Sequence, residues 1–330
     1  MGRFLRRARS LCDACFAVSR SGSEDGVTVK IYHELFREND RPLVLAIGFF
    51  DGMHRGHMEI AKAARRMRRP GYRVGVLTFL NHPAAFLRPG TEPPMLTTTA
   101  ERIDLFAQAG FEECFLVRFD DAIAQLTPQQ FLERLTAMGV QGAAVGATFR
   151  FGNKRAGDAP MMGAYFAQRN LPFAAIENVT HDGERISSTR IRALVEHGEL
   201  ERADYLLGHS YELRGVVEVG FGRGHDLDFP TANLRVPEKL LPKDGVYAAI
   251  ARHDGRDHAA LVSIGTNPQF DGKQRTIEAW LRDFHETIYG HEVALRDLRY
   301  LREQRLFASV DELIAQMRTD LEAVAYPSYG

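Results

Sequence analysis

Hydrophobic and polar positions follow two different patterns along this chain, and the change between them lies near residue 208. Before that point, short continuous apolar runs are separated by stretches in which apolar residues recur at helical spacing. Runs of the first kind predict buried strands of a parallel sheet, and stretches of the second kind predict amphipathic helices. Strands that alternate with helices indicate an α/β fold in which crossover helices connect parallel strands.

The first part of the chain also carries start signals for its helices. Thr98 and Glu101 form a capping box, which predicts a helix over 98–110. Thr127 and Gln130 open a further helix in the same way. We expect strands at residues 43–47, 74–79, 114–117 and 140–146, and another helix at residues 57–69.

The second part of the chain has the alternating pattern of short antiparallel strands. We expect strands at residues 211–219, 245–251, 259–264 and 276–281, with turns at 244–245 and 271–272. Short strands at this spacing predict a small antiparallel β-barrel, and residues 311–325 predict an amphipathic helix. We therefore expect an α/β domain at 29–208 and a barrel domain at 209–330.

The composition is typical of a soluble globular protein with two domains. The chain has 330 residues, of which 45% are hydrophobic and 26% are charged, and its net charge is −1. Such a charge gives no electrostatic reason to expect nucleic acid or a membrane surface as a partner. No apolar run approaches the roughly 18 residues that a membrane-spanning helix needs. Three cysteines are too few for a disulfide framework, so we expect a cytoplasmic location.

Residues 1–28 differ from the rest of the chain. They are rich in arginine, and residues 21–26 have the composition of a flexible segment. Asp13 interrupts the apolar run that a signal peptide would need, whereas a transit peptide is an alternative. Cys12 and Cys15 form a CxxC pair, for which zinc binding and redox chemistry are alternatives to an incidental pair. We expect a disordered extension with no part in the chemistry.

The most informative segment is residues 48–57, with the sequence GFFDGMHRGH. It lies between a predicted strand and a predicted helix, at the end of a parallel strand where α/β sheets bind ligands. Backbone N–H groups at a helix start attract phosphate, and glycine allows a phosphate to approach the backbone closely. His54 and His57 are three positions apart and can face the same bound group. A metal site is the alternative, but no further ligands of suitable spacing lie nearby.

A second polar segment, residues 186–192, has the sequence ISSTRIR. Ser187, Ser188 or Thr189 caps a predicted helix that ends before Gly198. A helix start with hydroxyl groups and arginines suits phosphate, although the segment by itself is also typical of an ordinary N-cap. Together with residues 48–57 it indicates a nucleotide site.

These segments resemble the signatures of the HxGH-type nucleotidylyltransferases, and among them the bacterial bifunctional riboflavin kinase/FMN adenylyltransferases (FAD synthetases). Residues 149–158 are similar to the stretch that lines the flavin side of that site. The resemblance implies a Rossmann-like N-terminal domain in which His54 and His57 are catalytic. It assigns ATP binding to Gly48, Phe50, Asp51, Gly52, Gly56, Ser187, Ser188, Thr189 and Arg192, and flavin binding to His82, Phe149 and Arg150.

The second part of the chain resembles riboflavin kinase. Residues 220–224 (GFGRG) and 229–233 (FPTAN) are similar to its signature, as are residues 263–270 and 275–278. Hydroxyl and amide oxygens are ligands suited to Mg²⁺ beside ATP phosphates, which indicates Thr231 and Asn233 as metal ligands. The resemblance makes Glu278 the catalytic base and places Arg302 near the flavin. It assigns ATP binding to Gly220, Gly222 and Gly224.

The implied chemistry is phosphorylation of riboflavin to FMN and adenylylation of FMN to FAD, with ATP as co-substrate and Mg²⁺ as cofactor. Several positions depart from the family pattern. Thr148 stands where an Asp or Asn is usual, Asn81 where a proline is common, Asp228 where a glycine is usual, and His225 where a basic residue is usual. One inactive module, or a flavin-binding regulator without catalysis, are therefore the alternatives. The sequence leaves the oligomeric state open.

Overall fold

The structure is a computed structural model that describes residues 28–34, 41–219, 231–266, 275–305 and 307–322. Its backbone contacts divide the chain into two compact units. The sheet unit comprises the described residues of Met1–Phe49, Ile60–Glu92 and Ile103–Ile176, and the barrel unit comprises those of Phe50–Glu59, Pro93–Arg102 and Glu177–Gly330. The extension expected at the N-terminus, with Cys12 and Cys15, lies outside the described residues apart from Thr28.

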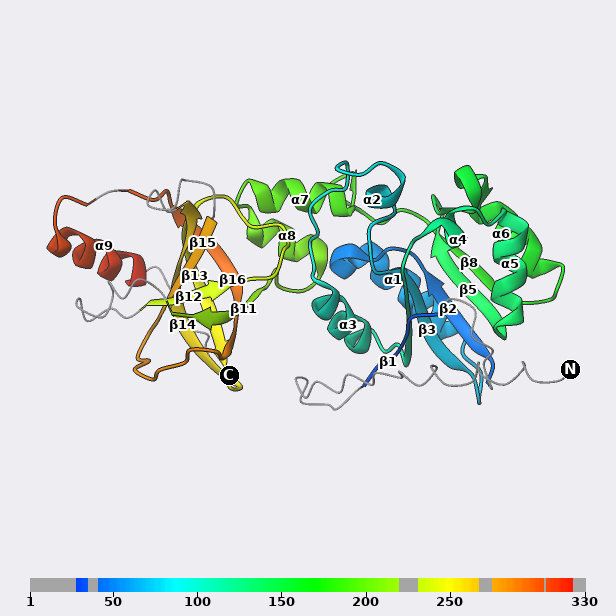
Figure 1. Cartoon of the computed structure of the whole chain (residues 1–330), viewed down its shortest axis with the longest axis horizontal. Coiled ribbons are helices and arrows are strands. Elements are labelled where there is room, and N and C mark those ends of the chain that lie inside the picture. The colour runs from blue at the N-terminus through cyan, green and yellow to red at the C-terminus, as the bar shows by residue number, and fades with distance from the viewer. Residues whose placement is uncertain (1–27, 35–40, 220–230, 267–274, 306, 323–330) are drawn as a thin grey trace, which may run out of the picture. The chain divides into compact units, whose positions relative to one another are not determined.

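A six-stranded parallel sheet in the order β1-β4-β3-β2-β5-β8 forms the centre of the sheet unit (Figure 1). The strands are β1 Lys30–Tyr32, β2 Leu43–Ile47, β3 Arg73–Phe79, β4 Glu113–Val117, β5 Val140–Gly146 and β8 Phe173–Ile176. The sheet grows in opposite directions from β2, through β3 on one side and β5 on the other. The carboxyl end of β2 is therefore at the topological switch point, where α/β sheets bind ligands.

The segments between these strands are mainly helical. The helices are α1 Arg55–Arg66, α2 Pro83–Leu87, α3 Thr99–Gln108, α4 Asp121–Ala124, α5 Pro128–Ala137 and α6 Ala159–Ala167, and the short elements are η1 Asp51–Met53, β6 Arg150–Phe151, η2 Asn153–Arg155 and β7 Gly157–Asp158. Helices α5 and α6 lie beside β5 and β8 (Figure 1). Their apolar faces bury Leu132 and Phe166 against Leu43 and Val145 of the sheet. The expected α/β architecture is confirmed.

A closed antiparallel barrel in the order β11-β12-β15-β14-β13-β16 confirms the expected fold of the second part. Its strands are β11 Leu213–Glu218, β12 Thr231–Arg235, β13 Gly245–His253, β14 Arg256–Thr266, β15 Arg275–Leu281 and β16 Glu292–Arg302. The barrel unit also contains β9 Thr180–His181, β10 Glu184–Arg185, α7 Ser188–Glu196, α8 Leu200–Leu207 and α9 Val310–Glu322. The turn expected at 271–272 lies outside the described residues.

One hydrophobic core fills the barrel and continues into α7 and α8. Val195 and Leu206 of these helices belong to the same buried cluster as Val262 and Leu295 of the barrel. A separate cluster lies on the outer face of the barrel, where Met317 of α9 packs against Ala248, Ala259 and Leu261. The barrel therefore buries apolar side chains on its inside and, under α9, on its outside as well.

The expected strands match the structure to within about three residues, but the pattern did not predict β1, β8 or β16. Asp297 has a positive φ of 55°, and the pairing of β16 with β13 shifts register at the same place. Such a bulge inserts an extra residue, so the buried positions Leu295 and Leu298 are three apart instead of two. The alternation that identifies a strand is lost there.

Candidate active sites

The turn that follows β2 is built from residues with unusual backbone angles. Phe50, Gly52 and Met53 all have positive φ, at 58°, 76° and 38°. A Cβ atom on Gly52 would also lie only 2.9 Å from Leu96 Cδ1, so glycine is required there for two reasons. The turn places Asp51, Gly52, Met53 and His54 in buried positions within the barrel unit. Gly48 lies before the turn and donates its N–H to Leu77 O at 3.1 Å.

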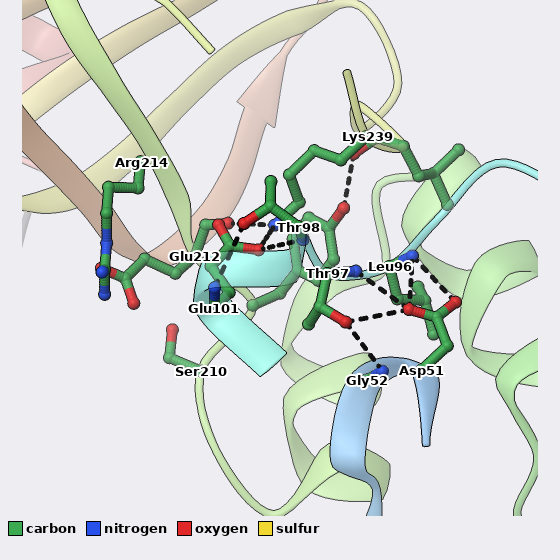
Figure 2. Close-up of polar contacts among 12 residues, drawn as sticks. Asp51, Gly52, Leu96, Thr97, Thr98, Glu101, Ser210, Glu212, Arg214 and Lys239 are labelled. Atoms are coloured by element: carbon green, nitrogen blue, oxygen red, sulfur yellow. Dashed lines mark hydrogen bonds and ion pairs between the residues drawn. The ribbon is translucent and has the colours of Figure 1, made fainter. Parts of the chain in front are cut away.

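Asp51 is the centre of a buried hydrogen-bond network (Figure 2). Its carboxylate accepts hydrogen bonds from the N–H groups of Leu96 and Thr97 at 3.0–3.1 Å, and from Thr97 Oγ1 at 2.9 Å. The hydroxyl of Thr97 in turn accepts the N–H of Gly52 at 3.1 Å. The carboxylate therefore fixes residues 96–97 against the turn. The expectation that Asp51 binds ATP stays a prediction.

The N-terminus of α7 is joined to the same turn. Arg192 forms an ion pair with Asp51 at 2.6 Å and donates from Nε to Pro94 O at 2.7 Å, and its side chain is 11% exposed. Ser187 caps the helix by accepting the N–H of Arg190 at 3.3 Å, and Ser188 donates to Asp51 O at 3.0 Å. The structure thus brings Ser187, Ser188 and Arg192 together with Asp51. Thr189 is exposed on the first turn of α7.

His54 and His57 lie side by side at the start of α1. Their rings stack with a centroid distance of 3.6 Å and an interplanar angle of 17°. His54 Nδ1 accepts the N–H of His57 at 3.3 Å, so a neutral His54 carries its proton on Nε2. Nδ1 of His57 is buried and has no hydrogen-bond partner among the described residues. A Cβ on Gly56 would lie 3.2 Å from the ring of His54, so this glycine makes room for the imidazole.

The surroundings of both rings disfavour the imidazolium form. Burial, followed by the positive charge of Arg185, lowers the pKa of His54 to about 4. Burial and then the neighbouring His54 lower the pKa of His57 well below its usual value. Both rings are therefore neutral near pH 7, and the nearby cations Arg185 and Arg192 favour a bound anion.

Several residues of this site were not expected from the sequence. They are Leu96 and Thr97, which bind Asp51, Arg185 near the histidines, and His209, whose Nε2 lies 3.0 Å from Gly52 O. The available signal for the first pair was Thr97, which directly precedes the capping box of α3. Nothing in the local pattern indicates His209, because its partner is 157 positions away.

The residues expected on the flavin side belong to the sheet unit. His82 caps α2 by accepting the N–H of Ala84 at 3.1 Å. Its ring packs edge to face on Phe49, with the two ring centroids 4.6 Å apart. Phe149 stacks on Phe151 with ring centroids 5.8 Å apart. Arg150 forms an exposed ion pair with Asp158 at 3.0 Å, and Thr148 is exposed. Flavin binding by His82, Phe149 and Arg150 stays a prediction.

The barrel brings three predicted kinase residues onto one face. Asn233 of β12 is directly opposite Glu278 of β15, and Thr231 lies two residues before Asn233. Cross-strand partners and residues two apart share a face of a sheet, so all three side chains share one. Ile277 and Ala279, the neighbours of Glu278, are buried in the barrel core, so this face is the outer one. Gly220, Gly222, Gly224 and Asp228 lie outside the described residues.

Arg302 lies at the end of β16 and binds α9. Its guanidinium forms an ion pair with Asp320 at 2.7 Å, and its Nη1 donates to Glu303 O at 3.1 Å. The arginine therefore fastens the last helix to the barrel. Its expected role in flavin binding stays a prediction.

Two family models match the chain in succession. One is described as FAD synthetase and covers residues 36–190, and the other is described as riboflavin kinase and covers residues 207–326. The bifunctional riboflavin kinase/FMN adenylyltransferase of Listeria monocytogenes is 35% identical over 300 residues, which are 89% of this chain and 95% of the relative. The protein of the same name from Bacillus subtilis is 32% identical, and the match again covers 89% of this chain and 95% of the relative.

A solved structure shows the same fold. The crystal structure titled macrolide-efflux protein from Streptococcus pneumoniae has a TM-score of 0.79 and 31% identity, and covers 87% of this chain and 94% of that one. In the part of our chain that the structure describes, no helix combines the length and apolar character needed to cross a membrane.

Proposed function

Because this chain belongs to the family of bifunctional riboflavin kinase/FMN adenylyltransferases, we propose that it phosphorylates riboflavin to FMN and then adenylylates FMN to FAD. The observation that carries the proposal is that both signatures occur in one chain, each on its matching fold. Residues 48–57 follow the switch-point strand of the parallel sheet, and Glu278 lies opposite Asn233 on the barrel.

For adenylyl transfer, we assign to residues 29–208 the reaction in which an FMN phosphate oxygen attacks the α-phosphorus of ATP. A bond forms between these two atoms, and the bond to the bridging oxygen breaks, which releases pyrophosphate. Such a transfer depends on positioning and on charge stabilisation. In this proposal His54 Nε2–H and His57 donate hydrogen bonds to the α-phosphate, and the N–H groups at the start of α7 face the outer phosphates.

For riboflavin phosphorylation, we assign to residues 209–330 the attack of a ribityl hydroxyl on the γ-phosphorus of ATP, which releases ADP. Glu278 accepts the hydroxyl proton as general base. The side-chain oxygens of Thr231 and Asn233 share the face of Glu278 and suit Mg²⁺, which prefers oxygen ligands. Bound Mg²⁺ would neutralise charge on the ATP phosphates.

A cytoplasmic location is part of the proposal, because both reactions consume ATP. The three cysteines are too few for a disulfide framework, which supports a reducing compartment.

The test is incubation of the protein with riboflavin, ATP and MgCl₂, followed by chromatographic separation of FMN from FAD. We expect both products, with FMN appearing first. FMN alone, or FAD only when FMN is supplied, would mean that one module is inactive. Tight flavin binding without any product would instead identify a flavin-binding regulator.

A further inference from the structure

A buried ion pair links the segment beside the signature turn to the barrel. Lys239 Nζ lies 2.9 Å from Glu101 Oε2, and the two side chains are only 1% and 7% exposed (Figure 2). Glu101 falls in the part of the chain that matches FAD synthetase, and Lys239 falls in the part that matches riboflavin kinase. The pair therefore joins residues from the two matched regions inside one compact unit.

Lys239 is held firmly on the barrel side. Its ammonium also donates to Glu212 O at 2.7 Å and lies 4.5 Å from the centre of the Tyr211 ring. The hydroxyl of Tyr211 donates to the carbonyl oxygen of Leu240, which directly follows Lys239 in the chain. Burial lowers the pKa of Lys239, and these contacts offset part of that cost and fix the position of the ammonium group.

Glu101 depends on this lysine for charge compensation. Its Oε1 is buried and has no hydrogen-bond partner among the described residues. Its Oε2 accepts the N–H of Thr98 at 2.8 Å, and Thr98 Oγ1 accepts the N–H of Glu101 at 3.2 Å, which completes the capping box of α3. Loss of the cation would leave a buried carboxylate at the first turn of α3.

The same barrel segment fixes both ends of residues 95–98. Leu240 N donates to Met95 O at 2.8 Å, while Lys239 holds Thr98 through Glu101. Between these two points lie the N–H groups of Leu96 and Thr97 that bind the carboxylate of Asp51 (Figure 2). Asp51 lies in the signature turn, three residues before His54. Residues 95–98 hold its carboxylate and therefore help to fix the position of this turn.

We propose that Lys239 is a positioning residue for adenylyl transfer: paired with Glu101, it holds residues 95–98 against Asp51 and thereby aligns His54 and His57. A residue of the kinase-like part thus supports the reaction of the other part. The inference rests on the proposed function, because it presumes that the histidines act in FAD formation.

The test compares Lys239→Met with the double variant Glu101→Gln/Lys239→Met in the full chain. The single variant leaves a buried carboxylate unpaired, whereas the double variant removes both charges and keeps similar side-chain volumes. We expect the single variant to lose thermal stability and the double variant to regain most of it. In both, kcat for FAD formation from FMN falls about tenfold, with a smaller change in KM, because the turn is misaligned in the transition state.

Riboflavin phosphorylation by the same samples is the internal control, and we expect it to stay within about twofold of the unmodified protein. Lys243→Met is the matched control, because Lys243 is an exposed lysine of the same barrel segment that pairs with Glu303 at 3.3 Å. We expect it to alter neither reaction.

The outcomes separate the positioning role from a structural one. If the double variant regains stability and also full FAD formation, or if both activities fall together with stability, the proposal is wrong. If the unmodified protein itself forms no FAD, the proposed function is wrong, whatever the role of Lys239.

Discussion

His54 and His57 are held in the neutral form by the residues around them. Burial and the charge of Arg185 stabilise the neutral imidazoles, and the hydrogen bond from His57 N selects the Nε2–H tautomer of His54. A neutral donor that is already oriented pays little reorganisation energy when charge develops on a phosphate. These two residues therefore suit stabilisation of the α-phosphate better than proton transfer.

The low pKa of His54 makes stability depend on pH. In the unfolded chain the imidazole takes up its proton near pH 6.5, but in the folded chain it does so only near pH 4. As the pH falls between these values, the unfolded state binds more protons, and the free energy of unfolding decreases. We measure the free energy of unfolding in urea at about pH 7 and about pH 5. We expect the decrease between these two pH values to be about 2 kcal/mol smaller for His54→Gln than for the unmodified protein. Equal losses would show that His54 is not held neutral.

Gly56 provides a test of the geometry beside His54. Alanine favours helix, but its Cβ would lie 3.2 Å from the His54 ring and would displace it. For Gly56→Ala we expect stability within about 1 kcal/mol of the original and at least about a tenfold loss of FAD formation. Full FAD formation would mean that the position of this ring does not matter.

Asp51 illustrates which site residues a sequence can reveal. The motif at 48–57 predicted a turn between a strand and a helix, and the structure has β2 before this turn and α1 after it, because strand, glycines and helix are neighbours in the chain. It did not reveal that Asp51 binds Leu96, Thr97 and Arg192, because these partners are 45, 46 and 141 positions away. Such contacts arise only when the chain folds.

At the level of elements, an ion pair near the C-terminal end of α9 and apolar packing along the helix hold α9 on the barrel. Asp320 is 5% exposed and pairs with Arg302, while Met317 and Leu321 pack on the outer face of β13 and β14. The helix thus covers an apolar patch that would otherwise face water.

Removing Asp320 tests how α9 is held. Asp320→Ala leaves the guanidinium of Arg302 without its carboxylate, so we expect a loss of about 2 kcal/mol and faster hydrogen exchange in α9. Arg318→Ala, at an exposed position of the same helix, is the control and should change stability by less than about 0.5 kcal/mol. Unchanged exchange in α9 after loss of Asp320 would show that apolar packing alone holds the helix.

The elements differ in how well their sequences predict them. The apolar runs of β2 and β5 matched their predicted bounds, because both strands are buried on both faces. The bounds of α1 differ, since Met67 and Arg68 donate to residues three positions back and end the α-helix at Arg66. Strand β16 was not predicted, because the bulge at Asp297 interrupts its alternation of buried and exposed positions.

At the scale of the whole molecule, sequence matches and compact units divide the chain differently. The matches to FAD synthetase and riboflavin kinase meet between residues 190 and 207, whereas the barrel unit also includes Phe50–Glu59 and Pro93–Arg102. The turn that carries His54 and His57 therefore shares its compact unit with the barrel. The ion pair between Glu101 and Lys239 is one physical reason for this arrangement.

The central claim is that one chain has two separate catalytic sites, and a pair of variants tests it most directly. His57→Ala and Glu278→Gln are each supplied with ATP and MgCl₂ and either riboflavin or FMN, and FMN and FAD are separated by chromatography. We predict that His57→Ala forms FMN but no FAD, and that Glu278→Gln forms FAD from supplied FMN but no FMN from riboflavin. Loss of both reactions in either correctly folded variant would contradict the claim.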